Sequence, residues 1–195
     1  GLGSNFPLPI SIDTYKSKVA REAIAAGVDM LNDISALRFD PKMKELIGEV
    51  KLPVVLMHTR GKPKDMQKDT HYQSLISEIL LYLGESIEMA QSSGLEPQQI
   101  VIDPGIGFGK SAEDCLRILR ELSQFKALGK PIMVGASRKS FIVKLLNADV
   151  GHRLEGTLAS VVVGIINGAN IVRVHDVKEV KKAALVADAI KNSSQ

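Results

Sequence analysis

Six short apolar runs, separated by longer amphipathic segments, constrain the fold more than any other feature of this sequence. The runs are rich in Ile, Val, Leu and Met, and they cover residues 9–13, 29–34, 53–58, 99–103, 131–135 and 169–174. Most are apolar nearly throughout, without strict alternation of apolar and polar residues. They therefore predict strands that are covered on both faces, as in a parallel sheet.

Helical patterns fill the segments between these runs. In residues 16–26, Val19 and Ala23 share one apolar stripe, and Gly27 follows as a residue suited to end a helix. Ser111 and Asp114 have the spacing of a capping box at the start of a later helix. The other helical patterns cover residues 42–50, 73–92, 112–128, 153–166 and 177–191. Six strand and helix pairs in alternation predict right-handed parallel units, which leaves a doubly wound sheet or a (β/α)8 barrel.

Polar residues at the strand ends favour the barrel. Each predicted strand ends in, or just before, a polar group: Asp13, Asn32, His58, Asp103, residues 135–139, and Arg173 with His175. A TIM (β/α)8-type barrel collects its functional groups from many strand ends, whereas a doubly wound sheet concentrates them at one switch point. Such barrels have eight strands, and this chain of 195 residues offers six. We therefore predict a single domain over residues 1–195 that is an incomplete barrel, with the first two βα units absent.

Composition excludes several classes of protein. The net charge is +3 with acids and bases interleaved, and eight aromatic residues with no Trp argue against a nucleic-acid platform. No apolar run reaches the roughly 18 residues that span a bilayer, and the first ten residues lack a signal-peptide pattern. The single Cys115 can form no internal disulfide. These features predict a cytoplasmic enzyme without redox chemistry.

A glycine-rich segment, residues 103–111, resembles a nucleotide loop but fails both tests for one. Three residues separate Gly105 from Gly109, where the phosphate loop requires four before its Gly-Lys pair, and Lys110 stands where the dinucleotide pattern requires glycine. We therefore interpret the glycines as a tight turn between a strand and a helix. Such a turn is compatible with Asp103 pointing into a site.

The acids and the amide at the strand ends predict a ligand rich in N–H donors. Asp13, Asn32 and Asp103 would converge on the mouth of a barrel, and a carboxylate can accept two parallel hydrogen bonds from an aminopyrimidine edge. Alternatives remain for single residues: Asp13 could cap a helix, and Asp33 could belong to a turn. A tightly held transition metal is disfavoured because the histidines are scattered, at positions 58, 71, 152 and 175.

Two cationic clusters would face the same mouth. One is residues 137–140, and the other is Arg173 with His175, which alternate with apolar Val172 and Val174 and so share one face of a strand. Arginine recognises phosphate oxygens with its planar fork, so an anionic leaving group or substrate tail is expected there. Solvated surface charge is the alternative.

The motifs in this order resemble the dihydropteroate synthase family. They are Ser11-Ile-Asp-Thr-Tyr15, Asn32-Asp-Ile-Ser35, Leu56-Met-His-Thr-Arg-Gly61, Ile102-Asp-Pro-Gly-Ile-Gly-Phe-Gly-Lys110, Gly135-Ala-Ser-Arg-Lys-Ser-Phe141, Gly156-Thr-Leu-Ala159 and Val172-Arg-Val-His-Asp-Val177. The family is a (β/α)8 barrel, so the resemblance implies the same architecture as the strand ends do.

The resemblance also implies a reaction. Enzymes of this family join a dihydropterin that carries a hydroxymethyl pyrophosphate to para-aminobenzoate, releasing pyrophosphate in folate biosynthesis, with Mg2+ at the leaving group. By matching positions, the roles implied are pterin binding for Asp13, Asn32, Asp103 and Lys139, pyrophosphate binding for Arg173 and His175, and the aminobenzoate side for Ser137 and Phe108. Lys139, Arg173 and His175 are the implied catalytic residues.

The chain also departs from the family. The first two units of the family supply an Asn at the Mg2+ site and two loops over the aminobenzoate, and nothing in this sequence matches them. The expectation is therefore a polypeptide that keeps part of the pterin pocket and turns over poorly alone. The alternatives are a pterin-binding fragment without catalysis and another pterin-binding barrel, such as a corrinoid methyltransferase. Further expectations from the resemblance are a homodimer, membership of a longer multifunctional folate-synthesis chain, and a mitochondrial location in a eukaryote.

Overall fold

The six predicted strands are present, and they run parallel. The computed structural model describes residues 7–147 and 153–193, so His152 and the first six residues lie outside the described parts. Strands β1 (Ser11–Asp13), β2 (Met30–Asp33), β3 (Val54–Met57) and β4 (Ile100–Asp103) pair in sequence order. Strands β5 (Met133–Val134) and β6 (Ile171–Val172) pair with each other. A single bridge between Ile102 and Ile132 joins the two sheets into one curved series.

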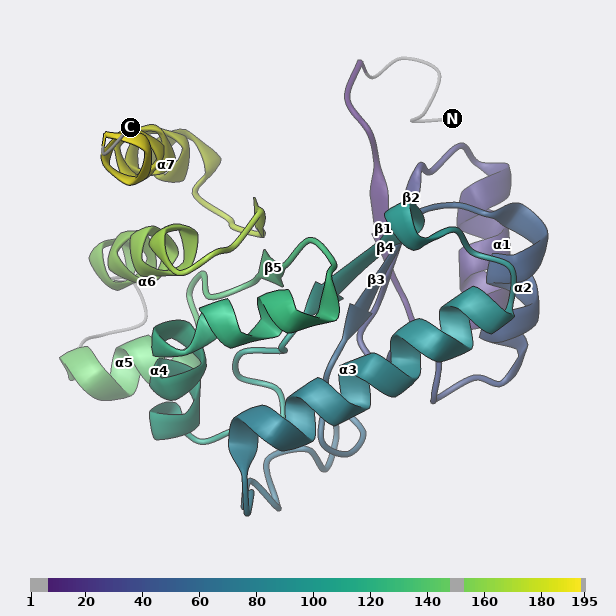
Figure 1. The fold of residues 1–195 in the computed structure, drawn as a ribbon, viewed down its shortest axis with the longest axis horizontal. Helices are drawn as coiled ribbons and strands as arrows, with labels where there is room; N and C mark the ends of the chain where they lie inside the picture. The colour runs from purple at the N-terminus through teal and green to yellow at the C-terminus, as the bar shows by residue number, and fades with distance from the viewer. Residues whose placement is uncertain (1–6, 148–152, 194–195) are drawn as a thin grey trace.

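Seven α-helices flank these strands in the described parts of the chain (Figure 1). They are α1 (Ser17–Ala25), α2 (Lys42–Val50), α3 (Leu75–Ser92), α4 (Ala112–Arg120), α5 (Ser140–Leu146), α6 (Leu154–Ile166) and α7 (Val177–Asn192). A short 3-10 turn, η2 (Pro97–Gln99), precedes β4. The predicted capping box at the start of α4 is confirmed, since Ser111 Oγ accepts from Asp114 N and the Asp114 carboxylate accepts from Ser111 N.

The helix predicted over residues 112–128 is wrong in its second half. Glu121 leaves the helical conformation, and Leu122–Leu128 form the 3-10 helix η3. Leu122 and Phe125 are fully buried three residues apart, and the three-residue turn of a 3-10 helix places both on one face. Helix α5 was not predicted, because its seven residues are too short for a periodic pattern.

Two hydrophobic clusters hold the layers together. The larger one lies between β1–β5 and the helices α1–α5, and it contains fully buried Leu31, Leu56, Leu83 and Phe125. The smaller one contains Val161, Ile165, Val180 and Ala187, and it joins α6 to α7. A third group, Val55, Val101 and Met133, comes from the opposite face of the strands and fills the inside of the curve.

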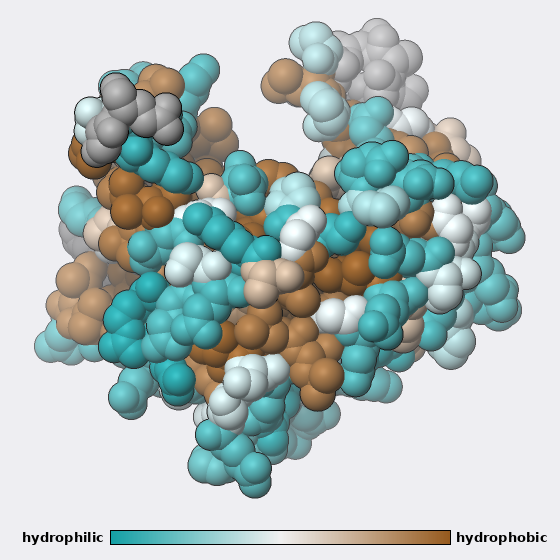
Figure 2. Space-filling model, in the orientation of Figure 1, coloured by the Kyte–Doolittle hydropathy of each residue, from teal (hydrophilic) through white to brown (hydrophobic). Residues whose placement is uncertain are grey.

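The series of strands has two ends that face each other across an open side. Within the described residues, β1 pairs only with β2, and β6 pairs only with β5. Figure 1 shows α6 and α7 on one side of this opening and β1 with α1 on the other. The space-filling view shows a notch between these two sides, flanked in part by apolar residues (Figure 2). No helix among the described residues is long and apolar enough to cross a bilayer.

Candidate functional site

A cavity of about 440 Å3 opens at the carboxyl ends of β3 to β6. Six of the eight predicted site residues line it: Asp103, Phe108, Ser137, Lys139, Arg173 and His175. Met57 and Ile106 supply apolar surface beside them. The strand-end prediction therefore holds for groups that lie up to about 70 positions apart in the sequence, because parallel strands bring their carboxyl ends to one rim.

A second cavity, of about 290 Å3, lies beside the first on the open side of the curve. It is lined by Asp13 and Asn32 from β1 and β2 and by Arg173 just after β6. Arg173 lines both cavities, and its Nη2 lies 2.7 Å from Asp13 Oδ2. All eight predicted site residues therefore belong to two adjoining cavities that share one arginine.

Asp103 is a buried acceptor at the end of β4. Its side chain is 6% exposed, and its Oδ1 accepts a 2.7 Å hydrogen bond from the Gly105 amide. Burial raises the pKa of this carboxyl, against the opposing effects of Lys139, Lys110 and Arg173. One oxygen thus orients the group, and Oδ2 has no protein hydrogen bond among the described residues and can accept from a ligand.

Asn32 Oδ1 is the one fully buried side-chain acceptor without a hydrogen-bond partner among the described residues. The Asn32 side chain nevertheless lines the second cavity. An unpaired buried carbonyl is costly, so this oxygen is suited to an N–H donor from a ligand.

The next residue, Asp33, belongs to a turn, as the alternative interpretation held. Its carboxylate accepts hydrogen bonds from Ser35 N, Ser35 Oγ and Leu37 N at 2.7–2.9 Å. The side chain is 1% exposed and lines neither cavity at the mouth. These bonds hold Ala36 and Leu37 at positive φ, 46° and 71°, a conformation that non-glycine residues rarely adopt.

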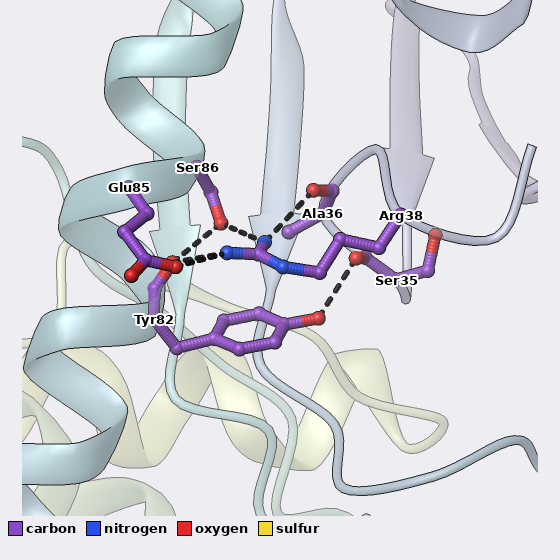
Figure 3. A network of polar contacts seen from close by, with 6 residues as sticks. All are labelled: Ser35, Ala36, Arg38, Tyr82, Glu85 and Ser86. Atoms are coloured by element: carbon purple, nitrogen blue, oxygen red, sulfur yellow. Dashed lines mark hydrogen bonds and ion pairs between the residues drawn. The ribbon is translucent and has the colours of Figure 1, made fainter. Parts of the chain in front are cut away.

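Helix α3 braces this turn with a polar network (Figure 3). The Tyr82 hydroxyl donates to Ser35 O at 2.8 Å, and the Arg38 guanidinium lies 3.7 Å from the Tyr82 ring centroid. The hydrogen-bond partners of Arg38 are Ala36 O, Tyr82 O, Glu85 and Ser86 Oγ. The turn after β2 is therefore fixed to α3, which keeps the strand end that carries Asn32 in place.

The glycine-rich segment forms the predicted tight turn after β4. Gly105 has φ 70°, and a Cβ there would lie 1.9 Å from His58 O, so only glycine fits. The turn places Phe108 in the cavity wall, with Lys139 Nζ 4.0 Å from its ring centroid. Burial lowers the pKa of Lys139, with Asp103 as the main opposing influence.

The cationic side of the cavity is built from two loops. Ser137 Oγ lies 3.0 Å from His175 Nδ1, and Arg138 pairs with Asp176 through two contacts of 3.1 and 2.5 Å. Strand β6 is shorter than predicted, so Arg173 and His175 lie just beyond it. Both line the same cavity, but Val174 between them lines it too, so the predicted alternation of faces does not continue past the end of the strand.

No group of three or more His, Cys, Asp or Glu side chains within residues 7–147 and 153–193 is arranged to hold a metal ion. At the cationic end, Asp13 is paired with Arg173 and Asp176 with Arg138. Among the described residues, therefore, no cluster of acidic side chains is arranged to hold Mg2+ by itself.

Comparison with known proteins assigns the family. The pterin binding enzyme family matches residues 2–175. A dihydropteroate synthase of Synechocystis is 45% identical over 190 residues, which cover 97% of this chain and 66% of that protein. The chain belongs to the dihydropteroate synthase family.

Solved structures of dihydropteroate synthases have the same fold. The enzyme of Clostridium difficile, solved in the presence of pteroic acid, gives a TM-score of 0.90 at 45% identity, over 97% of this chain and 70% of that one. The Xanthomonas albilineans enzyme with 4-aminobenzoic acid gives 0.90 at 36% identity, over 98% of this chain and 68% of that one. The predicted TIM-type barrel class is confirmed. The chain spans 62–69% of the length of the curated bacterial relatives.

Two parts of this site were not predicted from the sequence. One is a buried contact between Lys110 and His58, and the other is the ion pair between Arg138 and Asp176. Each joins residues from different units, so no local pattern indicates the pairing. The signal available was that His58 directly follows β3, and that Lys110 and Arg138 lie in the loops after β4 and β5, within motifs that the resemblance already marked.

Proposed function

We propose that this chain is a dihydropteroate synthase polypeptide that binds 6-hydroxymethyl-7,8-dihydropterin pyrophosphate and condenses it with para-aminobenzoate. The observation that carries the proposal is the pair of buried acceptors, Asp103 and Asn32, beside a cavity that also holds Arg173 and His175. An aminopyrimidine ring supplies N–H donors for the acceptors, and a diphosphate supplies oxygens for the cations.

The pterin ring would lie across the two cavities. The free oxygen of Asp103 and the orphaned Oδ1 of Asn32 accept ring N–H groups, and the Lys139 ammonium donates to a ring carbonyl. Asp13 accepts a further N–H group at the edge of the ring. Its ion pair with Arg173 is half exposed, with 41% of the Asp13 side chain and 56% of the Arg173 side chain open to solvent. The arginine can therefore reorient toward an arriving anion at small cost.

The chemistry needs no side-chain nucleophile. The bond between the methylene carbon and the pyrophosphate oxygen breaks, and its electron pair leaves with the pyrophosphate. Arg173 and His175 stabilise the charge that develops on that group. The amine nitrogen of para-aminobenzoate then forms the new bond to the methylene carbon and loses a proton. Phe108 and Ser137 line the side from which this amine would enter.

Calorimetric titration of the purified chain tests the proposal. We expect binding of dihydropterin pyrophosphate, competition by pyrophosphate, and slow formation of dihydropteroate when para-aminobenzoate is added. Pterin binding without product formation would favour the alternative of a catalytically weak pterin-binding polypeptide. Binding of a pterin that pyrophosphate does not weaken would instead favour a pterin-binding methyltransferase, because such an enzyme has no use for a diphosphate grip.

The partner and cofactor expectations stay predictions. Pairing with a second copy is supported by apolar side chains that α5, α6 and α7 expose, namely Leu145, Leu146, Val163, Ile166, Val177, Leu185, Val186 and Ile190. Membership of a longer folate-synthesis chain and a cytoplasmic location are likewise expected from the family. If Mg2+ takes part, the diphosphate itself would supply its ligands, because the described residues do not.

A further inference from the structure

A buried lysine and a buried histidine lie in contact behind the glycine-rich turn. Lys110 Nζ is 2.8 Å from His58 Nδ1 and donates to Phe108 O at 3.0 Å. Each side chain is only 4% exposed, and neither lines the cavities at the mouth. Burying an ammonium group is expensive, and a tight turn between a strand and a helix does not require one. The pair therefore calls for a role beyond closing the turn.

The environment of the pair makes the histidine an acceptor. Burial, with contributions from Lys110, Arg38 and Arg60, lowers the pKa of His58 to about 2, so the ring is neutral. Burial also lowers the pKa of Lys110 to about 7, against Cys115, Asp103 and Asp114, which favour its charged form. A neutral Nδ1 can accept from the ammonium, which directs another Nζ hydrogen to Phe108 O.

The histidine is itself held from two sides. Its ring meets the Tyr82 ring edge to face, with 4.6 Å between centroids, and its backbone N–H donates to Asp103 O at 2.9 Å. Tyr82 belongs to the network that braces the turn after β2 (Figure 3). His58 is thus a fixed support that connects α3 to the turn after β4.

Three successive carbonyls of the turn each accept a hydrogen bond from a side chain. Gln67 donates to Gly107 O, Lys110 to Phe108 O and Tyr72 to Gly109 O, at 2.8, 3.0 and 2.8 Å. The Phe108 ring instead lines the cavity, where Lys139 Nζ lies 4.0 Å from its centroid. Of these three residues, Phe108 is the residue that lines the cavity. The donor to its carbonyl, Lys110, is the most deeply buried of the three donors.

We propose that Lys110, supported by His58, is a positioning residue for the aromatic amine substrate. It fixes the Phe108 peptide so that the Phe108 ring and the Lys139 ammonium form one preformed wall of the aminobenzoate site. This inference rests on the proposed function for the identity of the ligand. The fixing of the peptide itself does not depend on any ligand.

The central variant is Lys110→Met, which keeps the length of the side chain and removes its donors. We expect amide hydrogen exchange at Phe108 and Gly109 to become about tenfold faster, because the turn loses its central anchor. The affinity of the pterin-loaded protein for para-aminobenzoate should fall about tenfold, while pterin affinity should change less than about threefold. Lys110 makes no hydrogen bond to Asp103 or Asn32, which hold the pterin. Its charge does lower the pKa of Asp103, so the comparison is made at neutral pH and above.

Matched variants distinguish the loss of Phe108 positioning from a general loss of stability. His58→Leu should reproduce the effects of Lys110→Met, and His58→Asn should restore most of the affinity, because an amide oxygen can replace Nδ1 as the acceptor. Lys144→Met, on the exposed face of α5, controls for the loss of a lysine and should change neither readout. If Lys110→Met does not fold, the two His58 variants carry the same comparison.

The outcomes distinguish this inference from the proposed function. Unchanged exchange and unchanged aminobenzoate affinity in folded Lys110→Met would overturn the inference. Equal losses of pterin and aminobenzoate affinity would overturn it too, since they indicate a merely structural role. If the unaltered chain binds neither ligand, the proposed function fails, and exchange at Phe108 still decides whether Lys110 fixes the turn.

Discussion

The two halves of the curved sheet are built differently, although they serve one mouth. Strands β1 to β4 have three or four residues each and pair in continuous register. Strands β5 and β6 have two residues each, and one bridge connects them to the rest. The first half belongs to the large hydrophobic cluster, whereas α6 and α7 are joined by a cluster with four buried members.

The side chains proposed to bind the ligand are also divided between the two halves of the sheet. The acceptors Asp13, Asn32 and Asp103 are the last or next-to-last residues of strands in the first half. The groups proposed for the anion, Arg173 and His175, lie in a loop beyond a two-residue strand. Recognition of a flat ring depends on acceptors held at fixed positions, whereas a flexible diphosphate can be held by exposed, adjustable donor side chains. The difference in strand length matches this difference in task.

Core substitutions test the structural side of this comparison, and they have the largest expected effect. Leu83→Ala removes a fully buried side chain from the large cluster and should cost about 4 kcal/mol of unfolding free energy. Ile165→Ala, in the small cluster, should cost about 2 kcal/mol, because fewer neighbours surround the cavity that it leaves. Urea unfolding monitored by circular dichroism measures both.

Leu81→Ala on the exposed face of α3 is the control, and it should change stability by less than about 0.5 kcal/mol. Equal costs for the two buried substitutions would mean that the two halves are equally well packed and would remove the structural basis of the comparison.

Asp103→Asn tests the ring side. The amide oxygen can still accept from Gly105 N, but the amide nitrogen would face a ligand N–H donor. We expect pterin affinity to fall about a hundredfold, which corresponds to roughly 2.8 kcal/mol. Calorimetric titration with a pterin that lacks the diphosphate isolates this contact. A loss of less than about threefold would show that Asp103 does not bind the ring.

Two pH effects accompany this contact. Ligand binding requires the carboxylate, and burial raises the pKa of Asp103 above its usual 3.8, so affinity should begin to fall at a higher pH than for an exposed aspartate. The protonated form favours folding when the folded-state pKa is raised, so the contribution of Asp103 to stability decreases as pH rises through that pKa. Asp103→Asn should therefore be no less stable than the unaltered chain at neutral pH.

Arg173→Met tests the anion side and has the smallest expected effect of the three. Affinity for dihydropterin pyrophosphate should fall about tenfold, because one exposed charge-assisted contact is lost. At neutral pH, affinity for the same pterin without its diphosphate should stay within about threefold, since Arg173 makes no hydrogen bond to Asp103 or Asn32. The ratio of the two affinities, measured by titration, is the test. Equal losses for both ligands would mean that Arg173 supports the ring pocket instead.

The sequence predicted the strands and the mouth because both depend on local patterns. Apolar runs gave the six strands, and the polar residue after each run gave the site groups, from Asp13 to His175. The two mistakes in the predicted helices also concern local structure. Helix α5 is too short to show a helical repeat of apolar residues. The break at Glu121 accompanies the burial of Leu122 and Phe125, which the apolar pattern of the sequence does not reveal.

The amino-acid sequence by itself determined the alternation of strand and helix, the family motifs and the residues at the strand ends, since period and position along the chain are properties of the chain alone. Only the tertiary structure decided that Asp33 closes a turn while Asn32 faces a cavity with an unpaired oxygen. It also decided that Lys110 is supported by His58, 52 positions away. Burial and hydrogen-bond pairing depend on which units meet in space, and sequence separation does not specify that.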